Sequence, residues 1–84
     1  MIVQLNQILQ MSIFLRSMGF SIRRHYNEFF IYDDKGFFCY LLYRRNDLIE
    51  IYLPKWRKAD EEKLFLLRRN LKKIFSNPEI KIFK

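Results

Sequence analysis

Apolar residues recur every three or four positions over residues 3–18, which is the spacing of one face of a helix. This stripe comprises Leu5, Ile8, Leu9, Ser12, Leu15 and Met18. The opposite side carries the polar residues Gln4, Asn6, Gln7, Gln10 and Arg16. The pattern predicts an amphipathic helix with the stripe in the core. Gly19 stands where a glycine of positive φ commonly ends a helix.

Four segments typical of strands follow, at residues 20–25, 28–32, 37–44 and 48–53. They are rich in aromatic and β-branched residues, and turn sequences separate them. Asp33-Asp34-Lys35-Gly36 predicts a hairpin turn in which Gly36 takes a positive φ. Pro54 ends the fourth strand, because proline has no N–H to donate to a neighbouring strand.

A second helix is predicted over residues 60–75. Asp60 is a suitable N-cap, and the acidic residues that follow it favour the positive end of a helix. The apolar stripe of this helix comprises Leu64, Leu67, Leu71, Ile74 and Phe75. Ser76-Asn77-Pro78 ends the helix, and the alternation of residues 79–83 predicts a short edge strand.

The predicted order is therefore helix, four strands, helix and strand, which is an α+β fold. The 84 residues are enough for one small domain, so we expect a single domain over residues 1–84. The simplest packing is an antiparallel meander with both helices on one face.

The predicted strands carry apolar residues on both faces of this sheet. Pairing by the two turns places Tyr32 opposite Phe38 and Leu42 opposite Ile51. The face assigned to the helices then comprises Phe30, Tyr32, Phe38, Tyr40, Leu42, Ile49, Ile51 and Leu53. The second face holds one charged residue, Glu50, beside Phe29, Ile31, Phe37, Cys39, Leu41, Tyr43 and Tyr52.

A sheet with one face in water would alternate more cleanly, so something is predicted to cover the second face. The candidates are a second copy of the chain, a partner protein and nucleic-acid bases. The predicted interface comprises Phe29, Ile31, Phe37, Leu41, Tyr43 and Tyr52. A register displaced by one residue, or an N-terminal segment that wraps around the sheet, would also explain the pattern.

Positive charge is concentrated in the last third of the chain. The net charge is +7, and residues 1–53 carry six Lys or Arg against five Asp or Glu. Residues 54–84 carry ten against four. Such an asymmetry indicates a polyanionic partner or an acidic protein surface, and it also serves solubility.

Two groups of residues in this basic third predict contact with nucleic acid. The first is the loop Lys55-Trp56-Arg57-Lys58, and the second is the outer side of the following helix, with Phe65, Arg68, Arg69, Lys72 and Lys73. Aromatic rings among cations suit phosphate contacts combined with stacking. Two plainer interpretations compete: the cations favour the helix end and its solvation, or Trp56 and Phe65 pack on each other.

Catalytic, cofactor-binding and metal-binding motifs are not evident in the sequence. Cys39 lies in an apolar run and is predicted to be a small buried side chain. Asp33 and Asp34 precede a glycine and are more typical of a turn than of a cation site. We therefore expect no enzyme, no cofactor and no metal.

The amino-terminal region does not resemble a signal peptide or a membrane span, because glutamine and asparagine interrupt its apolar run and no basic residue precedes Arg16. We expect a cytoplasmic protein without a membrane partner.

Three functional hypotheses follow. The favoured one is a small nucleic-acid-binding or nucleoprotein-associated module, with DNA and RNA not distinguished. The alternative is a protein-interaction module, such as a small regulator or inhibitor from a mobile element, which acts through the apolar sheet face and includes the case of a homodimer. The least favoured is a nuclease that uses His25 with Arg23 or Arg24.

Overall fold

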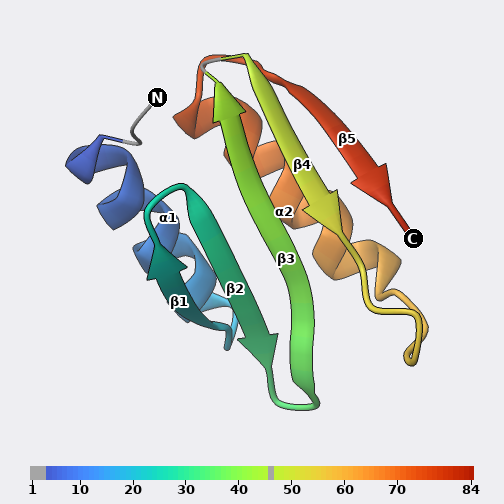
Figure 1. Ribbon diagram of the computed structural model, residues 1–84. Helices are drawn as coiled ribbons and strands as arrows, with labels where there is room; N and C mark the ends of the chain where they lie inside the picture. Colours follow the sequence, from blue (N-terminus) through green and yellow to red (C-terminus); the bar gives the residue numbers. More distant parts are fainter. Residues whose placement is uncertain (1–3, 46) are drawn as a thin grey trace.

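Two helices and five strands form the described part of the chain, residues 4–45 and 47–84, in this computed structural model (Figure 1). In chain order they are α1 (Leu5–Ser17), β1 (Ser21–His25), β2 (Glu28–Asp33), β3 (Gly36–Arg45), β4 (Leu48–Tyr52), α2 (Glu61–Ile74) and β5 (Glu79–Phe83). The predicted α+β class and element order are confirmed.

The five strands form one sheet in the order β1-β2-β3-β4-β5. The first four strands are paired antiparallel, and β5 is parallel to β4. A parallel neighbour requires a crossover connection, and α2 provides it. The prediction of a wholly antiparallel sheet is therefore wrong at β5.

The helix ends follow the capping residues in the sequence. Gly19 has a φ of +83°, and the N–H groups of Gly19 and Phe20 donate to the carbonyls of Arg16 and Leu15 at 3.0 and 2.8 Å. This is the Schellman pattern, in which two free carbonyls of the last turn are satisfied. At α2, the Asp60 side chain accepts from the Lys63 N–H at 3.1 Å, which confirms Asp60 as the N-cap.

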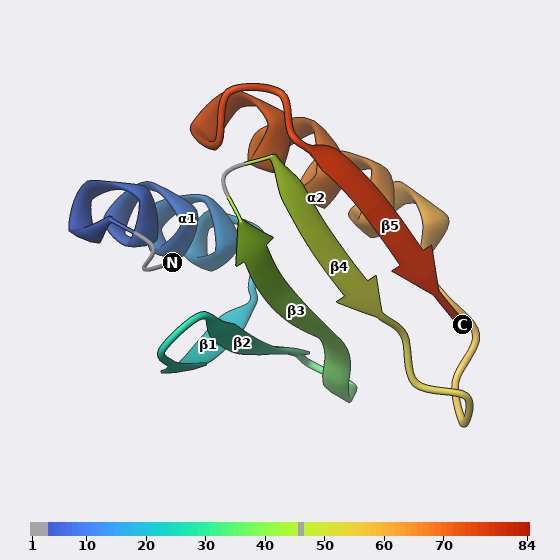
Figure 2. The same cartoon turned by 45° about the horizontal axis from the view of Figure 1, so that its top comes forward.

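One hydrophobic core joins both helices to one face of the sheet, and Figure 2 shows α1 and α2 on the same side of the strands. The fully buried side chains include Met11, Leu15, Phe29, Ile31, Cys39, Leu41, Ile49, Ile51, Leu67 and Leu71. The opposite face of the sheet, which we call the open face, has no helix over it within the described residues. The prediction that Cys39 is buried is confirmed.

Two β-bulges decide which side chains face the core. Ile31 pairs with Cys39 while Tyr32 pairs with Phe37, so Phe38 is an extra residue in β3. Arg45 pairs with Leu48 while Tyr43 pairs with Ile49, so Arg44 is a second extra residue. Each bulge reverses the alternation beyond it.

The predicted interface is wrong at four of its six residues, because the helices cover the face of β2 and β3 that was expected to meet a partner. Phe29, Ile31 and Leu41 are fully buried, and Tyr43 is 3% exposed. These four side chains pack in the core and cannot contact a partner. Of the six predicted interface residues, only Phe37 and Tyr52 lie on the open face. Strand β4 is displaced by one residue from the predicted register, so that Leu41, not Leu42, lies opposite Ile51.

The orientation of α1 also differs from the prediction. Leu5 and Leu9, which were expected in the core, are 71% and 55% exposed. Met11 and Leu15 take the core positions and are fully buried. Ile13 is 70% exposed, so α1 presents an outward apolar stripe of three residues that lie four apart, Leu5, Leu9 and Ile13.

Candidate functional surfaces

The outer face of α2 gathers five of the nine residues that the sequence predicts to contact nucleic acid. They are Phe65, Arg68, Arg69, Lys72 and Lys73, and all are exposed. Within the described residues, no carboxylate lies within 4.0 Å of the four cations. Their charge is therefore not offset by a direct ion pair. We call these five residues the α2 cationic face.

A shallow hollow of about 280 Å³ lies at the centre of the α2 cationic face, lined by Phe65, Arg68, Arg69 and Lys72. These positions are three, four and seven residues after Phe65, so helix geometry alone brings the three cations to one side of the ring. Phe65 is 61% exposed. The ring is thus accessible to a ligand that carries both negative charge and a flat apolar surface.

Arg57, in contrast, is held inside the fold. Its guanidinium donates two hydrogen bonds to the Asp33 carboxylate, both at 2.9 Å, and a third to the Phe37 carbonyl at 3.2 Å. The Asp33 side chain is 2% exposed and that of Arg57 is 17% exposed. Arg57 thus uses three of its donors to join the loop to the β2–β3 turn, so we leave it out of the α2 cationic face.

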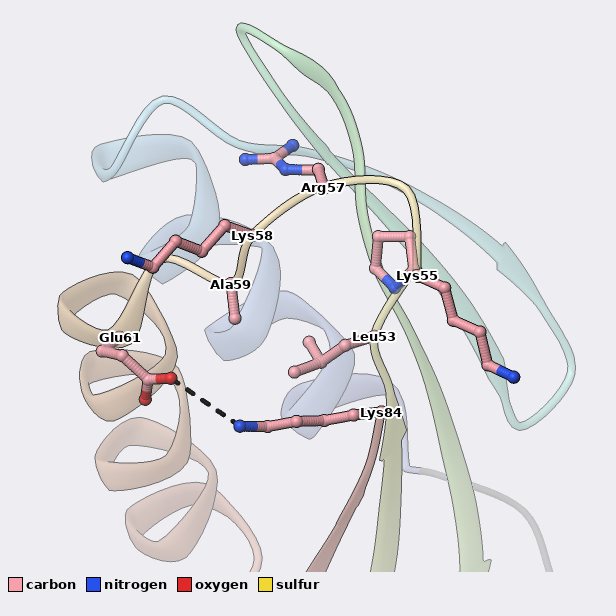
Figure 3. Close-up of a pocket in the computed structure, with 8 residues that line it drawn as sticks. Leu53, Lys55, Arg57, Lys58, Ala59, Glu61 and Lys84 are labelled. Carbon is pink, nitrogen blue, oxygen red and sulfur yellow. Dashed lines mark ion pairs between the residues drawn. The ribbon is translucent and has the colours of Figure 1, made fainter.

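Lys55, Trp56 and Lys58 do not line the hollow of the α2 cationic face. Figure 3 shows Lys55 and Lys58 pointing to opposite sides of the loop, around a groove of about 450 Å³. Lys84 crosses this groove toward Glu61 at 4.0 Å. Trp56 is 77% exposed, and its ring centroid lies 6.0 Å from that of Phe37 on the open face. The interpretation that Trp56 packs on Phe65 is wrong, and the predicted site divides into two separate surfaces.

The open face of the sheet carries a continuous array of rings, of which Phe30, Tyr32 and Tyr40 were predicted in the core. Phe30, Tyr40, Tyr52 and Phe83 follow one another across β2, β3, β4 and β5, with neighbouring centroids 5.1, 5.6 and 4.7 Å apart. A second row comprises Tyr32, Phe37 and Trp56, with centroids 5.7 and 6.0 Å apart. We call these seven residues the ring array.

Two glutamates mark this face as the outer one and could have identified it. Glu28 lies two residues before Phe30, and Glu50 lies two residues before Tyr52, so each shares a face with a ring. A carboxylate costs several kcal/mol to bury without a partner, so these faces must point to solvent. The sequence therefore held the signal that fixes the orientation of the sheet.

The carboxylates on the open face are already hydrogen-bonded within the protein. The Tyr40 hydroxyl donates to Glu28 at 2.6 Å, and His25 lies 3.5 Å from the same carboxylate. These contacts, the Tyr40 hydrogen bond first, lower the pKa of Glu28. Partial burial and the Glu28 contact raise the pKa of Tyr40 to about 12, so its hydroxyl keeps its proton and fixes the ring.

Glu50 is held in the same way. Tyr52 and Arg44 both donate to its Oε1, each at 2.9 Å. The Arg44 hydrogen bond, followed by that of Tyr52, lowers the pKa of Glu50. The bulge residue Arg44 thus neutralises the central acid of the open face.

No known protein family matches the chain, and no curated protein or solved structure matches it either.

Groups with catalytic potential are few in the described part of the chain. Burial raises the pKa of the Cys39 thiol to about 12, so it is not a thiolate nucleophile at neutral pH. His25 is exposed beside Glu28. No group of three or more metal-ligating side chains occurs among the described residues, and none of their helices is long and apolar enough to cross a membrane.

Proposed function

We propose that this protein is a non-enzymatic nucleic-acid-binding module whose α2 cationic face contacts phosphates. The observation that carries this proposal is a dense group of cations that have no ion pair within the described part of the chain. Arg68, Arg69, Lys72 and Lys73 lie within six consecutive residues, all exposed, around the accessible ring of Phe65. A helix end alone benefits from one or two basic residues in its last turn. Arg68 and Arg69 lie a turn earlier, so the helix end does not account for them.

Binding through this face is expected to depend strongly on salt. Each phosphate that is neutralised on a duplex contributes about −0.9 to the slope of log K against log salt concentration. Four contacts would give a slope of about −3.6, or about −2.8 on a single strand. A titration between about 50 and 300 mM salt measures this slope directly.

Charge reversal at Arg69 and Lys73 tests the proposal. We expect the double variant R69E/K73E to bind a labelled oligonucleotide more than tenfold more weakly, with a slope reduced by about two contacts. The matched control is R16E/R24E, which reverses two exposed cations elsewhere. Both variants change the net charge by four, from +7 to +3. Equal losses in the two variants would mean that net charge, not the α2 cationic face, governs binding.

A second candidate function is self-association through α1, which one observation favours. Leu5, Leu9 and Ile13 form an exposed apolar stripe on a helix that has no acidic residue and only Arg16 as a basic one. Two copies of a cationic protein repel each other over most of their surface. The outer face of α1 is the place where two copies can meet with little repulsion, so we propose a second copy as the occupant of this stripe.

A further inference from the structure

The ring array on the open face is more than an ordinary set of cross-strand pairs. Cross-strand rings stabilise a sheet, but one pair of rings is enough to stabilise one pair of strands. A row of rings across several strands is not needed for stability. Here one row runs without interruption across four strands and ends with Tyr52 and Phe83 stacked at 4.7 Å and 13°. Seven rings on one uncovered face form an apolar surface of the kind that marks a binding site.

The exposed members lie at the margin of the array. Trp56 is 77% exposed and Phe83 is 39% exposed, while the rings between them are half-buried by one another. Phe83 lies on the edge strand β5, and Trp56 lies in the loop after β4. A flat ligand could therefore add to the array at both places without displacing any element.

The charges on this face select among ligands. The central acids, Glu28 and Glu50, already accept hydrogen bonds from the protein. Arg23 on β1 pairs across from Phe30, and Lys81 on β5 pairs across from Glu50. With Lys55 on the loop, three cations without an ion pair within 4.0 Å among the described residues surround the array. This arrangement suits a ligand with flat apolar groups over the centre and negative charges at the margin.

We propose that the open face binds the unpaired bases of single-stranded nucleic acid by stacking on the ring array, with phosphates at its cationic margin. The proposal rests on the proposed function for the class of ligand and adds both the site and the strandedness. Aromatic side chains accept any base because every base has a π-face. A duplex keeps its base faces inside its own stack, so it cannot use this surface.

The lone tryptophan makes the contact observable. Trp56 is the only tryptophan in the sequence, and a base stacked on it quenches its fluorescence. The probe is a single-stranded oligothymidylate of about ten nucleotides, within the size range of stacking sites. A GC-rich DNA hairpin with the same number of phosphates serves as the duplex probe. We expect the single strand to quench Trp56 fluorescence and to bind more tightly than the hairpin. The hairpin should leave Trp56 fluorescence unchanged.

Substitution of the marginal rings tests the site. We expect W56A and F83A each to weaken single-strand binding about tenfold, as is typical for loss of one stacking ring. The salt slope should not change, because no phosphate contact is lost. F83Y keeps a ring and should bind like the wild type. F83L keeps an apolar side chain without a ring, so loss of affinity in F83L at unchanged stability separates stacking from a merely structural role. The matched control is Y26A, which removes a ring that is 74% exposed outside the array.

The outcomes separate this inference from the proposed function. If W56A and F83A bind like the wild type, and Trp56 emission is unchanged at saturation while R69E/K73E still weakens binding, the sheet site is refuted and the α2 cationic face stands. If R69E/K73E binds like R16E/R24E but the ring variants lose affinity, the assignment of phosphate contacts to α2 is refuted. If neither probe binds, as would be the case for a protein partner, both proposals are overturned.

Discussion

Asp33 connects three parts of the fold through a single carboxylate. It accepts from the Lys35 N–H within its own turn at 2.9 Å, from Arg57 in the loop and from Lys63 on α2 at 3.1 Å. The side chain is 2% exposed. The contact with Arg57, opposed by burial, holds the pKa of Asp33 well below its ordinary value of 3.8.

Replacing Asp33 by Asn should destabilise the protein by about 3 kcal/mol at pH 7, because it leaves the Arg57 and Lys63 charges without their buried partner. A carboxyl whose folded pKa is depressed contributes stability above its unfolded pKa and loses it as pH falls toward the folded pKa. The free energy of urea unfolding should therefore differ most between wild type and D33N at pH 7. The difference should shrink below pH 4, near the ordinary aspartate pKa of 3.8.

Asp34 offers the control for this experiment. Its side chain is 81% exposed and lies 3.9 Å from Lys63, so D34N should change the free energy of unfolding by less than about 0.5 kcal/mol. A D33N deficit that is as large at pH 2 as at pH 7 would contradict the assigned role of the carboxylate.

The sequence reveals half of the role of Asp33. The turn was predictable, because Asp before glycine favours local hydrogen bonds to the backbone, and the Lys35 contact is of this kind. The partners Arg57 and Lys63 lie 24 and 30 residues away. No local pattern indicates such a contact, so Arg57 was assigned to a ligand rather than to the fold.

At the scale of elements, Gly19 shows a local rule that transfers directly from sequence to structure. Its φ of +83° is unfavourable for any side chain, although an added Cβ would meet no atom within 4 Å. Substitution therefore costs only the backbone strain of the left-handed region, which is about 1–2 kcal/mol.

We expect G19A to lower the free energy of urea unfolding by about 1–2 kcal/mol, with no change in nucleic-acid binding. G19N is the matched comparison, because asparagine tolerates positive φ better than alanine. If G19A were as stable as wild type, the helix end would have to close by another geometry, and hydrogen exchange at the Phe20 N–H would show it.

The bulges are the elements that the sequence could not predict. Helix bounds, turns and strand order follow from capping residues, glycines and alternation, and all appear near their predicted positions. Phe38 and Arg44 are extra residues without a glycine to mark them. The Phe38 bulge moves Phe37 to the open face, and the Arg44 bulge displaces β4 by one residue. Phe29 and Leu41 pair as predicted, so their misassignment came from the choice of the core face, which Glu28 and Glu50 could have corrected.

At the scale of the whole molecule, the chain carries two different surfaces on opposite sides of one core. Both helices lie on one side of the sheet (Figures 1 and 2). That side presents charge on α2 and aliphatic side chains on α1, and the sheet side presents rings. The concentration of charge after residue 53 was evident in the sequence. The sequence did not show that this region divides into the α2 cationic face and a separate loop. Arg57 turns inward toward Asp33, and Trp56 lies beside Phe37.

The aliphatic stripe on α1 leads to a prediction about assembly. Replacing Leu5, Leu9 and Ile13 together by glutamine keeps helix propensity nearly constant and removes exposed apolar surface without touching the core. We expect wild type to sediment as a dimer at high protein concentration and the triple variant to sediment as a monomer with an unchanged circular dichroism spectrum.

Phe65→Gln is the appropriate comparison for this experiment. It removes an apolar side chain that is 61% exposed on α2, so it should leave the sedimentation coefficient unchanged if α1 alone mediates contact between copies. Dimers should also form more readily at high salt, because screening reduces repulsion between two chains of net charge +7 while apolar contact persists. Nucleic-acid binding through the α2 cationic face has the opposite salt dependence, so the two associations can be measured separately in the same protein. A wild-type chain that stays monomeric at high concentration and high salt would remove the second copy as the occupant of α1.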